Sequence, residues 1–403
     1  MDGTVNGRPD TAVLCLNSGS SSVKVGLLLP DEVDAGAGER AGAPRVAEAT
    51  VEAIGSGEGR ARAKGREGTR AIEQVVGRID HQTAIEVALD LVDRLADRAP
   101  EIVAHRVVHG GPRHTAPAKV DDALIVSLED LIPLAPLHIP ASIAGIRAAR
   151  HRWPDLPQVA CFDTAFHATL PEVARRLPLP DAILGEEVRR YGFHGLSYAH
   201  VMWALGPTAP ARIVIAHLGS GSSLVAVKDG RAIDTTMGFT PTGGIPMGTR
   251  TGDLDPGVLF YLARNRRLSI DDLEQICDRE GGLRAIGGTG DVRDLLARAP
   301  GDREAALAIS IYGYTIRKAI GAFAAALGGV DLLIFTGGIG EHAPIVRREA
   351  CRDLEGLGIE IDPERNERGA RRISSDGSRC RVLLIAADEE SAMARDARSV
   401  AGR

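Results

Sequence analysis

The hydrophobic positions of this chain fall into short apolar runs that end in glycine-rich turns. Residues 12–28, "AVLCLNSGSSSVKVGLL", place apolar strands on both sides of a Gly/Ser turn, as in a β-hairpin. The stretch "RIVIAHLGSGSSLVAVKDGRAIDT" from Arg212 repeats this pattern, and "VDLLIFTGGIGEHAP" from Val330 is a third strand with a glycine-rich end. Their spacing is much longer than the ~20–50 residues of a solenoid repeat. The pattern therefore predicts two related α/β halves that face a shared cleft.

Helical spacing appears between these runs. From His81, apolar residues recur as in an amphipathic helix that packs on a sheet. The stretch "REAALAISIYGYTIRKAIGAFAAALGG" from Arg303 predicts a long helix that ends at Gly328. "EIVAHRVVHGG" and "QVACFDTAFH" predict buried strands, and "ESAMARDARSVAGR" predicts a last helix that returns to the first domain. Strands that alternate with helices indicate an α/β fold. Residues 31–70, rich in Gly, Ala, Glu and Arg, predict loops and edge strands without chemistry.

Length and composition narrow the class of protein. The 403 residues exceed what one hydrophobic core usually organises, so we expect two domains. A net charge of -6, without a long basic run, gives no reason to expect nucleic acid. The five cysteines form no CxxC pair, which favours reduced thiols and a cytoplasmic location. No apolar run reaches the roughly 18 residues of a membrane span, so no membrane partner is expected.

Polar residues near the ends of the apolar runs are the candidates for chemistry, because such side chains project into a crevice of an α/β sheet. They are Arg106, Asp163, His194, Arg250 and Glu389. Each of them alone could be part of a structural ion pair, and a lone histidine is more often a buried imidazole than a catalytic group. The first turn adds hydroxyls and the ammonium of Lys24, donors suited to phosphate oxygens. It is not a P-loop, because a strand and not a helix follows it.

Ten short motifs occur along the chain in a fixed order. They are "LNSGSSSVK", "HRVVHGG", "LAPLH", "CFDTAFH", "RRYGFHGLS", "HLGSGSS", "FTPTGGIPMGTRTGDLDPG", "GTGDVRD", "FTGGIGE" and "ADEESAMARDA". Together they resemble the acetate kinase family of acyl-phosphate-forming kinases, from Leu16 to Ala397. The resemblance implies two ribonuclease-H-like domains of the acetate and sugar kinase, chaperone and actin superfold, with an interdomain ATP cleft. The expected domains are residues 11–163, joined by a C-terminal helix at about 391–403, and residues 164–390.

The resemblance also implies the site. The catalytic residues are Arg106, Asp163, His194 and Arg250. The acyl-substrate site contains Arg106 and is lined by Val108, Leu137, His138, Phe193 and Pro241. The ATP site comprises Lys24, His217, Leu218, Gly219, Ser220, Gly221, Asp291, Val292, Arg293, Gly337, Gly338, Ile339, Gly340 and Glu341. Ser20 and Ser22 face the transferred phosphate, and Asn17 and Glu389 meet the metal, with Glu390 as the adjacent alternative.

The resemblance to the acetate kinase family also implies a role for each of these site residues. Arg106 and Arg250 bind the carboxylate and the phosphoryl group, and His194 donates to the phosphoryl group in the transition state. Asp163 either orients Arg106 or the carboxyl substrate, or shares in metal binding through water. His138 has a lesser, supporting role. Asp291 and Arg293 border the adenosine, with a solvated ion pair as the alternative interpretation. The expected reaction is reversible, direct in-line phosphoryl transfer between ATP and acetate, giving acetyl phosphate and ADP. The implied cofactor is Mg²⁺, or Mn²⁺, and the implied assembly is a homodimer through the second domain.

Several positions depart from the family pattern, namely Ser220, Ser222, Ile139, Ala141, Tyr198, His342 and Asp388. Asp388 adds a negative charge near the expected metal, so we expect it to tighten the metal site or change its preference. A propionate or other short-chain acyl kinase is the main alternative, because one methylene changes pocket binding by only about 1–3 kcal/mol. A non-kinase ATPase of the same superfold is a remote one. A sugar kinase would need a polar pocket, whereas the expected acyl wall is apolar.

Overall fold

The computed structural model describes residues 11–19, 21–31, 40, 42–55, 57–66 and 71–402. The chain forms two compact units: residues 1–166, 195–206 and 388–403 in the first, and residues 167–194 and 207–387 in the second. The sequence-based boundaries assign residues 195–206 to the second domain. In the structure this segment forms helix α6 (Gly195–Leu205) and packs on the C-terminal helix α15 (Glu389–Ala401) of the first unit. The expected domain boundaries stay a prediction.

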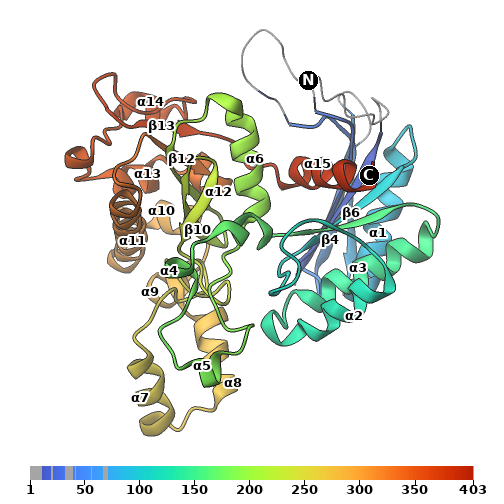
Figure 1. Ribbon diagram of the computed structural model, residues 1–403, viewed down its shortest axis with the longest axis horizontal. Coiled ribbons are helices and arrows are strands. Elements are labelled where there is room, and N and C mark those ends of the chain that lie inside the picture. The colour runs from blue at the N-terminus through green and yellow to red at the C-terminus, as the bar shows by residue number, and fades with distance from the viewer. Residues whose placement is uncertain are drawn as a thin grey trace. The chain divides into compact units, whose positions relative to one another are not determined.

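The first unit is built on an eight-stranded sheet with the order β5-β4-β3-β2-β1-β6-β8-β7 (Figure 1). Its strands are β1 (Val13–Ser18), β2 (Ser22–Leu28), β3 (Arg45–Glu52), β4 (Gly59–Gly65), β5 (Ala71–Gly77), β6 (Ile102–Val107), β7 (Ala118–Lys119) and β8 (Gln158–Phe162). Strands β1, β2 and β3 form an antiparallel meander, and β6 and β8 run parallel to β1.

The second unit is built on a five-stranded sheet with the order β11-β10-β9-β12-β13. Its strands are β9 (Arg212–Leu218), β10 (Ser222–Lys228), β11 (Arg231–Thr235), β12 (Leu332–Thr336) and β13 (Arg381–Leu384). Here too the first three strands form an antiparallel meander, and the last two run parallel to the first. Order and direction match β3-β2-β1-β6-β8 strand for strand. This confirms the predicted duplication of a ribonuclease-H-like α/β unit.

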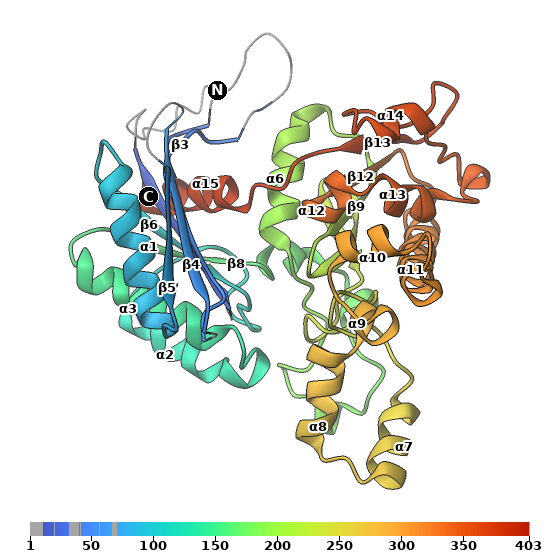
Figure 2. The ribbon, with the colours of Figure 1, turned by 180° about the vertical axis from the view of Figure 1, so that it is seen from behind.

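Helices cover both faces of the first sheet because successive side chains of a strand point to opposite faces. On β1, Leu14 and Leu16 belong to the core under α1 (His81–Leu95), whereas Val13 and Cys15 belong to the core under α15. Figure 2 shows α1 lying along the strands that it covers. Helices α2 (Asp122–Asp130) and α3 (Ile139–Arg152) belong to this unit as well. The expected return of the last helix to the first unit is confirmed.

The second unit is mostly helical outside its sheet. Its α-helices are α4 (Glu172–Arg175), α5 (Asp181–Leu184), α7 (Pro256–Arg266), α8 (Ile270–Gln275), α9 (Gly282–Gly287), α10 (Val292–Arg298), α11 (Arg303–Leu327), α12 (Gly337–His342), α13 (Pro344–Cys351) and α14 (Pro363–Glu367). The predicted long helix is α11. Asp302 caps its first turn by accepting from the backbone N–H groups of Glu304 and Ala305, and Gly328 ends it in the left-handed conformation.

The glycine-rich turn after β12 leads into α12. One expectation about elements is wrong. Strands β3 and β4 lie inside the first sheet, where they were expected at an edge. Alternation of small buried residues with polar ones explains this, since Ala49 and Val51 of β3 and Ala61 of β4 are fully enclosed. Within the described residues, no helix has the length and apolar character that a membrane span requires.

Candidate active site

Arg106 and Asp163 form the centre of the predicted site in the first unit. They stand at the ends of the neighbouring parallel strands β6 and β8. In this strand pair, Val107 of β6 lies opposite Phe162 of β8. Arg106 donates from Nε to Asp163 Oδ1 (3.1 Å) and from Nη2 to Oδ2 (2.7 Å). The Asp163 side chain is only 1% exposed. This two-pronged, buried ion pair fixes the plane of the guanidinium group, which supports the orienting role among those expected for Asp163.

The third guanidinium nitrogen of Arg106, Nη1, contacts two further predicted residues. Its Nη1 lies 3.1 Å from Glu389 Oε2, at the start of α15, and donates to Asn17 Oδ1 of β1 at 3.5 Å. Burial by itself would lower the pKa of Arg106, but the carboxylates of Asp163 and Glu389 outweigh burial and raise it. The guanidinium is therefore permanently charged. Four elements, β1, β6, β8 and α15, thus bring one cation and three oxygen-bearing side chains together.

Glu389 and Glu390 have different surroundings. The Glu390 side chain is 4% exposed and is held by two cations, with Lys24 Nζ at 3.0 Å from Oε1 and Arg45 Nε at 3.2 Å from Oε2. Glu389 is 18% exposed and shares Arg106 with Asn17. Oxygen donors suit Mg²⁺, which needs only one or two from the protein beside phosphates and waters. Asn17 and Glu389 fit that requirement, whereas each of the two carboxylate oxygens of Glu390 is held by a cation.

His194 is the centre of the predicted residues in the second unit. Its backbone has φ of 59°, in the left-handed region that non-glycine residues rarely adopt. Its Nδ1 lies 2.8 Å from Ser223 Oγ, and its ring stacks on the ring of His217 with 4.3 Å between centroids. The serine contact fixes the ring so that Nε2 points away from Ser223. Sequence reasoning missed this partner, although Ser223 lies within the "HLGSGSS" motif.

Arg250 and the turn at Gly221 converge on His194. A Cβ built on Gly221 would lie 3.2 Å from His194 Nε2 and 3.5 Å from Arg250 Nη1. Arg250 also donates from Nη1 to the carbonyl oxygen of Pro241 at 3.1 Å. Burial lowers the pKa of Arg250, and Asp278 partly offsets this; an arginine starts so high that it keeps its charge. A glycine turn, an imidazole and a guanidinium therefore meet at one place of the second unit.

Two of the predicted nucleotide turns lie side by side. Thr336 at the end of β12 pairs with His217 of β9, and a Cβ on Gly337 (φ 79°) would lie 2.7 Å from the carbonyl oxygen of Leu218. Only glycine fits there. Residues 219–221 form the tight turn after β9, with Gly219 N donating to Gly221 O at 3.1 Å and Ser220 exposed. Gly338, Ile339, Gly340 and Glu341 form the body of α12.

Ser222 has a structural partner that the sequence does not reveal. Its Oγ lies 2.7 Å from the hydroxyl of Tyr312 on α11 and 3.0 Å from the carbonyl oxygen of Gly219, to which it donates. All of Tyr312 is buried, and burial raises its pKa while the bond to Ser222 lowers it. The departure at Ser222 therefore ties the turn to α11.

Other predicted ATP residues have local partners. Asp291 caps α10, accepting from Arg293 N at 2.9 Å, and its carboxylate also binds the Arg293 guanidinium, whose Nη2 lies at 2.8 Å. The Arg293 side chain is 91% exposed, so the solvated ion pair expected as an alternative is present. Val292 opens α10. Glu341 accepts from the backbone N–H of Ala387 at 2.8 Å. Contacts of these residues with adenosine stay a prediction.

The predicted acyl wall is divided between the units. Val108, Leu137 and His138 belong to the first, and Phe193 and Pro241 to the second. His138 stands at the start of α3, where it makes no side-chain capping bond, and Phe193 is buried. Ser22 is the first residue of β2, and Ser20 lies outside the described residues.

The departures from the family pattern are accommodated locally. Ile139 and Tyr198 are fully buried in the first unit, and Ala141 lies in the first turn of α3. His342 ends α12. The carboxylate of Asp388 lies 2.7 Å from Arg45 Nη2, so its added charge has a partner.

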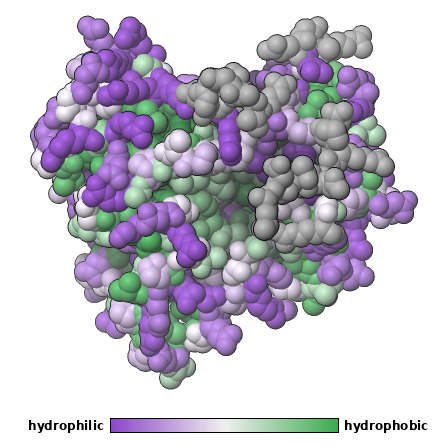
Figure 3. All heavy atoms as spheres, turned by 45° about the horizontal axis from the view of Figure 1, so that its top comes forward, coloured by the Kyte–Doolittle hydropathy of each residue, from purple (hydrophilic) through white to green (hydrophobic). Residues whose placement is uncertain are grey.

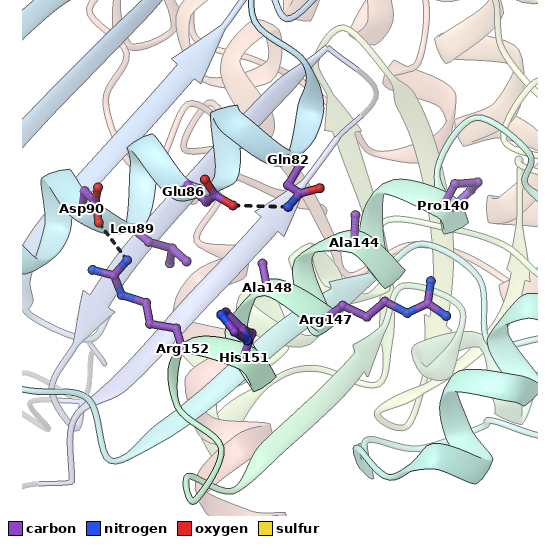
Figure 4. A pocket seen from close by; sticks show the side chains of 10 residues that line it. All are labelled: Gln82, Glu86, Leu89, Asp90, Pro140, Ala144, Arg147, Ala148, His151 and Arg152. Carbon is purple, nitrogen blue, oxygen red and sulfur yellow. Dashed lines mark hydrogen bonds and ion pairs between the residues drawn. The ribbon is translucent and has the colours of Figure 1, made fainter.

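A groove between α1 and α3 contains none of the predicted residues (Figure 4). It has a volume of about 810 Å³, with Leu89, Ala144 and Ala148 among its lining residues. Its cations already have partners, since Arg152 pairs with Asp90 at 2.7 Å and Arg147 pairs with Glu129 at 2.5 Å.

Comparison with known proteins settles the family. The sequence model of the Acetokinase family matches residues 12–395. The chain belongs to this family. An acetate kinase from Leifsonia xyli subsp. xyli is 44% identical over 402 residues, covering 96% of this chain and 98% of its relative. An acetate kinase from Streptomyces avermitilis is 42% identical over 408 residues, covering 97% and 98%.

Solved structures of Acetokinase-like enzymes agree with the fold. A propionate kinase from Francisella tularensis subsp. tularensis superimposes with a TM-score of 0.88 at 32% identity, covering 97% of this chain and 100% of its own. An acetate kinase from Porphyromonas gingivalis has a TM-score of 0.85 at 35% identity, with the same coverage. The predicted superfold and the predicted enzyme family are confirmed. This family of phosphotransferases uses a carboxyl group as the acceptor.

Proposed function

We propose that this chain is an acetate kinase that transfers a phosphoryl group reversibly between ATP and acetate. The observation that carries the proposal is the cluster of Arg106 with Asp163, Glu389 and Asn17 at the strand ends of the first unit. A partly buried arginine, held flat by one carboxylate and bound to a second carboxylate and an amide oxygen, suits the binding of anionic oxygens near a metal. Membership of the Acetokinase family supports the same conclusion.

The reaction requires two anions to meet, so the protein must align them and neutralise their charge. We assign Arg106 and Arg250 to the carboxylate and the phosphoryl group, because a guanidinium binds two oxygens at once. Asp163 holds Arg106 in the required orientation. The transfer is direct and in line, and the chain needs no covalent intermediate of its own.

His194 supplies a proton donor to the phosphoryl oxygens. We assign the neutral tautomer with its proton on Nε2, the atom that faces Gly221 and Arg250, so that the Ser223 hydroxyl, 2.8 Å from Nδ1, acts as the donor to Nδ1. A preorganised donor of this kind stabilises charge that develops in the transition state. The stack on His217 keeps the ring in this position.

The proposed metal is Mg²⁺, with Mn²⁺ as a possible substitute, held by Asn17 and Glu389. When bound, it neutralises phosphate oxygens and orients them. The remaining work falls to the chain: Arg106 keeps the two oxygen donors together, and the turns at residues 219–221 and 337–340 offer backbone N–H groups to the nucleotide phosphates. Lys24, which is paired with Glu390, stays assigned to the phosphate side.

Acetate is the proposed substrate because the predicted acyl wall is small and apolar. Propionate is the second candidate, since a structurally similar protein at 32% identity is described as a propionate kinase. An added methylene changes pocket binding by only about 1–3 kcal/mol. We therefore expect acetate and propionate to be accepted in that order. The cytoplasmic location expected from the sequence stays a prediction.

We also propose a homodimer through the second unit. Large hydrophobic side chains of this unit are exposed, namely Val173, Leu179, Ile183, Leu254, Val258, Phe260, Tyr261 and Ile270. Figure 3 shows hydrophobic residues in patches among hydrophilic ones on the face that it draws. Where such side chains gather in one patch, they are typical of a surface that binds another protein. Sedimentation analysis checks this proposal, and a monomer at all concentrations would contradict it.

The dependence of ATP consumption on an added carboxylate tests the proposed function. We expect ADP release with Mg²⁺ and acetate, weaker release with propionate and butyrate, and little without an acid. Arg231→Ala, an exposed arginine of β11, is the control for Arg106→Ala. ADP release that is equal with and without acid would identify an ATPase and overturn the proposal.

A further inference from the structure

Residues 42–45, which the sequence pattern left without chemistry, contact the turn that carries Glu389. The backbone N–H of Ala43 donates to Ser391 Oγ at 2.8 Å. Two residues later, at the start of β3, Arg45 reaches both neighbours of Glu389. These contacts join segments that are more than 340 residues apart in the sequence.

Arg45 binds both acids that flank Glu389. Its Nη2 donates to Asp388 Oδ1 at 2.7 Å, and its Nε donates to Glu390 Oε2 at 3.2 Å. Asp388 in turn caps α15, accepting from Ser391 N at 3.1 Å and from Ser391 Oγ at 2.6 Å. One guanidinium therefore anchors residues 388 and 390, and Glu389 is the acid between them.

The packing around these acids is tight. A Cβ on Gly42 would lie 2.3 Å from Asp388 Oδ2, and a Cβ on Gly26 would lie 3.0 Å from Glu390 Oε2. Lys24 Nζ holds the other oxygen of Glu390 at 3.0 Å. Because neighbouring strands enclose Asp388 and Glu390, their side chains have little room to change places with that of Glu389.

The three consecutive acids, Asp388, Glu389 and Glu390, have different cationic partners. Three consecutive carboxylates repel one another, and one metal site needs only one of them. Arg45 pairs with Asp388, and both Lys24 and Arg45 pair with Glu390. Glu389 is the acid of these three that pairs with Arg106, at 3.1 Å. If the positive charge of Arg45 were absent, Asp388 would lose its ion-pair partner. The turn that carries Glu389 would also lose its side-chain contact with β3.

We propose that Arg45 is a positioning residue for the metal site: by holding Asp388 and Glu390, it fixes Glu389 beside Arg106 and Asn17. This inference rests on the proposed function, because it assumes that Glu389 meets the metal. Asp388, which departs from the family pattern, belongs to this device, since an asparagine would keep the helix cap but lose the ion pair with Arg45.

The test compares Arg45→Gln with Arg62→Gln. Arg62 on the adjacent strand β4 also forms ion pairs with two acids, Glu52 and Glu73, but they are exposed and remote in sequence from Glu389. The measurements are the binding of Mn²⁺ to the ADP-loaded protein, followed by electron paramagnetic resonance, and the KM values for Mg²⁺ and acetate. Changes in residues that orient metal ligands typically cost about 10–100-fold in metal affinity.

We expect Arg45→Gln to weaken Mn²⁺ binding and to raise the KM for Mg²⁺ by about tenfold or more, with a much smaller change in the KM for acetate. Arg45→Lys keeps the charge but loses the two-pronged contact, so it should fall between Arg45→Gln and the unmodified chain. Adding Asp388→Asn to Arg45→Gln should recover part of the Mn²⁺ affinity by removing the unpaired charge.

Equal Mn²⁺ affinity in Arg45→Gln and Arg62→Gln would overturn the inference. If Arg45→Gln does not fold, Arg45→Lys decides by the same comparison. Failure of the proposed function is separate: it would show as absence of acetate-dependent turnover in the unmodified chain. Mn²⁺ binding still reports on the position of Glu389 in that case.

Discussion

Arg106 and Asp163 show how much depends on single residues in this protein. Their ion pair is buried, so each partner depends on the other for compensation of its charge. The sequence predicts both residues, because they lie near the ends of apolar strands and within motifs of the family. Their pairing, and the convergence of Glu389 and Asn17 on the same guanidinium, depends on strand register, which a pattern of residues does not contain.

Asp163→Asn keeps the volume of the side chain but removes its charge. We expect kcat/KM for acetate to fall by about 10²–10³-fold, as when a preorganised polar group of an active site is lost. The partly buried guanidinium loses its main partner, so the free energy of unfolding should fall by about 3 kcal/mol. Steady-state kinetics and urea unfolding measure both. A variant with normal kcat/KM would contradict the orienting role of Asp163.

Tyr312→Phe removes the hydroxyl that binds Ser222. A lost buried hydrogen bond costs about 1–2 kcal/mol, and the turn at residues 219–221 should become less ordered, so the KM for ATP should rise more than the KM for acetate. Tyr314→Phe is the matched control, since Tyr314 lies on the same helix but is 53% exposed. Equal KM values for ATP in the two variants would show that Tyr312 does not act on the turn.

Residues such as Arg45 and Tyr312 could not be found from the sequence. Arg45 lies in a stretch of Gly, Ala, Glu and Arg without a motif, and Tyr312 reads as one more apolar residue of a long helix. Both act through contacts with residues far away in the chain. Only the folded structure shows that the buried hydroxyl of Tyr312 faces the hydroxyl of Ser222.

At the scale of elements, strong periodicity made α1, α11 and the two hairpins predictable. The internal position of β3 and β4 was not, because small residues such as Ala49 and Ala61 give a weak hydrophobic signal although the sheet encloses them. The element that follows the turn after β12 was left open by the sequence. Glycine permits both a hairpin turn and the entry to a helix, so the sequence "TGGIGE" did not decide between them.

Two glycines, one inside α11 and one at its C-terminal cap, should respond in opposite directions to substitution by alanine. Gly328 ends the helix at φ 72°, so Gly328→Ala should lower the free energy of unfolding by about 1–2 kcal/mol. Gly321 lies inside the helix, and a Cβ there would meet nothing within 4 Å. Gly321→Ala should therefore raise the free energy of unfolding by about 0.5–1 kcal/mol. Urea unfolding measures both, and a gain from Gly328→Ala would contradict the assigned cap.

At the scale of the whole molecule, two sheets of the same strand order form the framework. The repeated hairpin pattern predicted this duplication, because the meander that opens each unit uses the same apolar strands and Gly/Ser turn. The expected domains, residues 11–163 and 164–390, already divide the predicted acyl wall. Residues 167–194 join the second unit, so Phe193 belongs with Pro241 and not with Val108.

Acid should destabilise the fold through buried histidines in both units. Burial lowers the pKa of His105 in the first unit and of His167 in the second from 6.5 to about 4. Between these values the unfolded chain binds more protons, so stability falls as pH drops from about 6.5 towards 4. Each histidine contributes a slope of up to ~1.4 kcal/mol per pH unit.

Urea unfolding at about pH 7 and about pH 5 measures this effect, and His105→Gln should reduce the difference. Asp396 works in the opposite direction, because burial raises its pKa to about 6 despite Arg395. An unchanged difference in His105→Gln would show that His105 is not neutral in the fold.

The most direct test of the account is the trapping of acyl phosphate with hydroxylamine in the presence of ATP and Mg²⁺. We predict hydroxamate that requires added acetate and that disappears in both Arg106→Ala and Arg250→Ala, one arginine from each unit. A folded chain that binds ATP but forms no hydroxamate with acetate, propionate or butyrate would contradict the assignment as an acyl kinase.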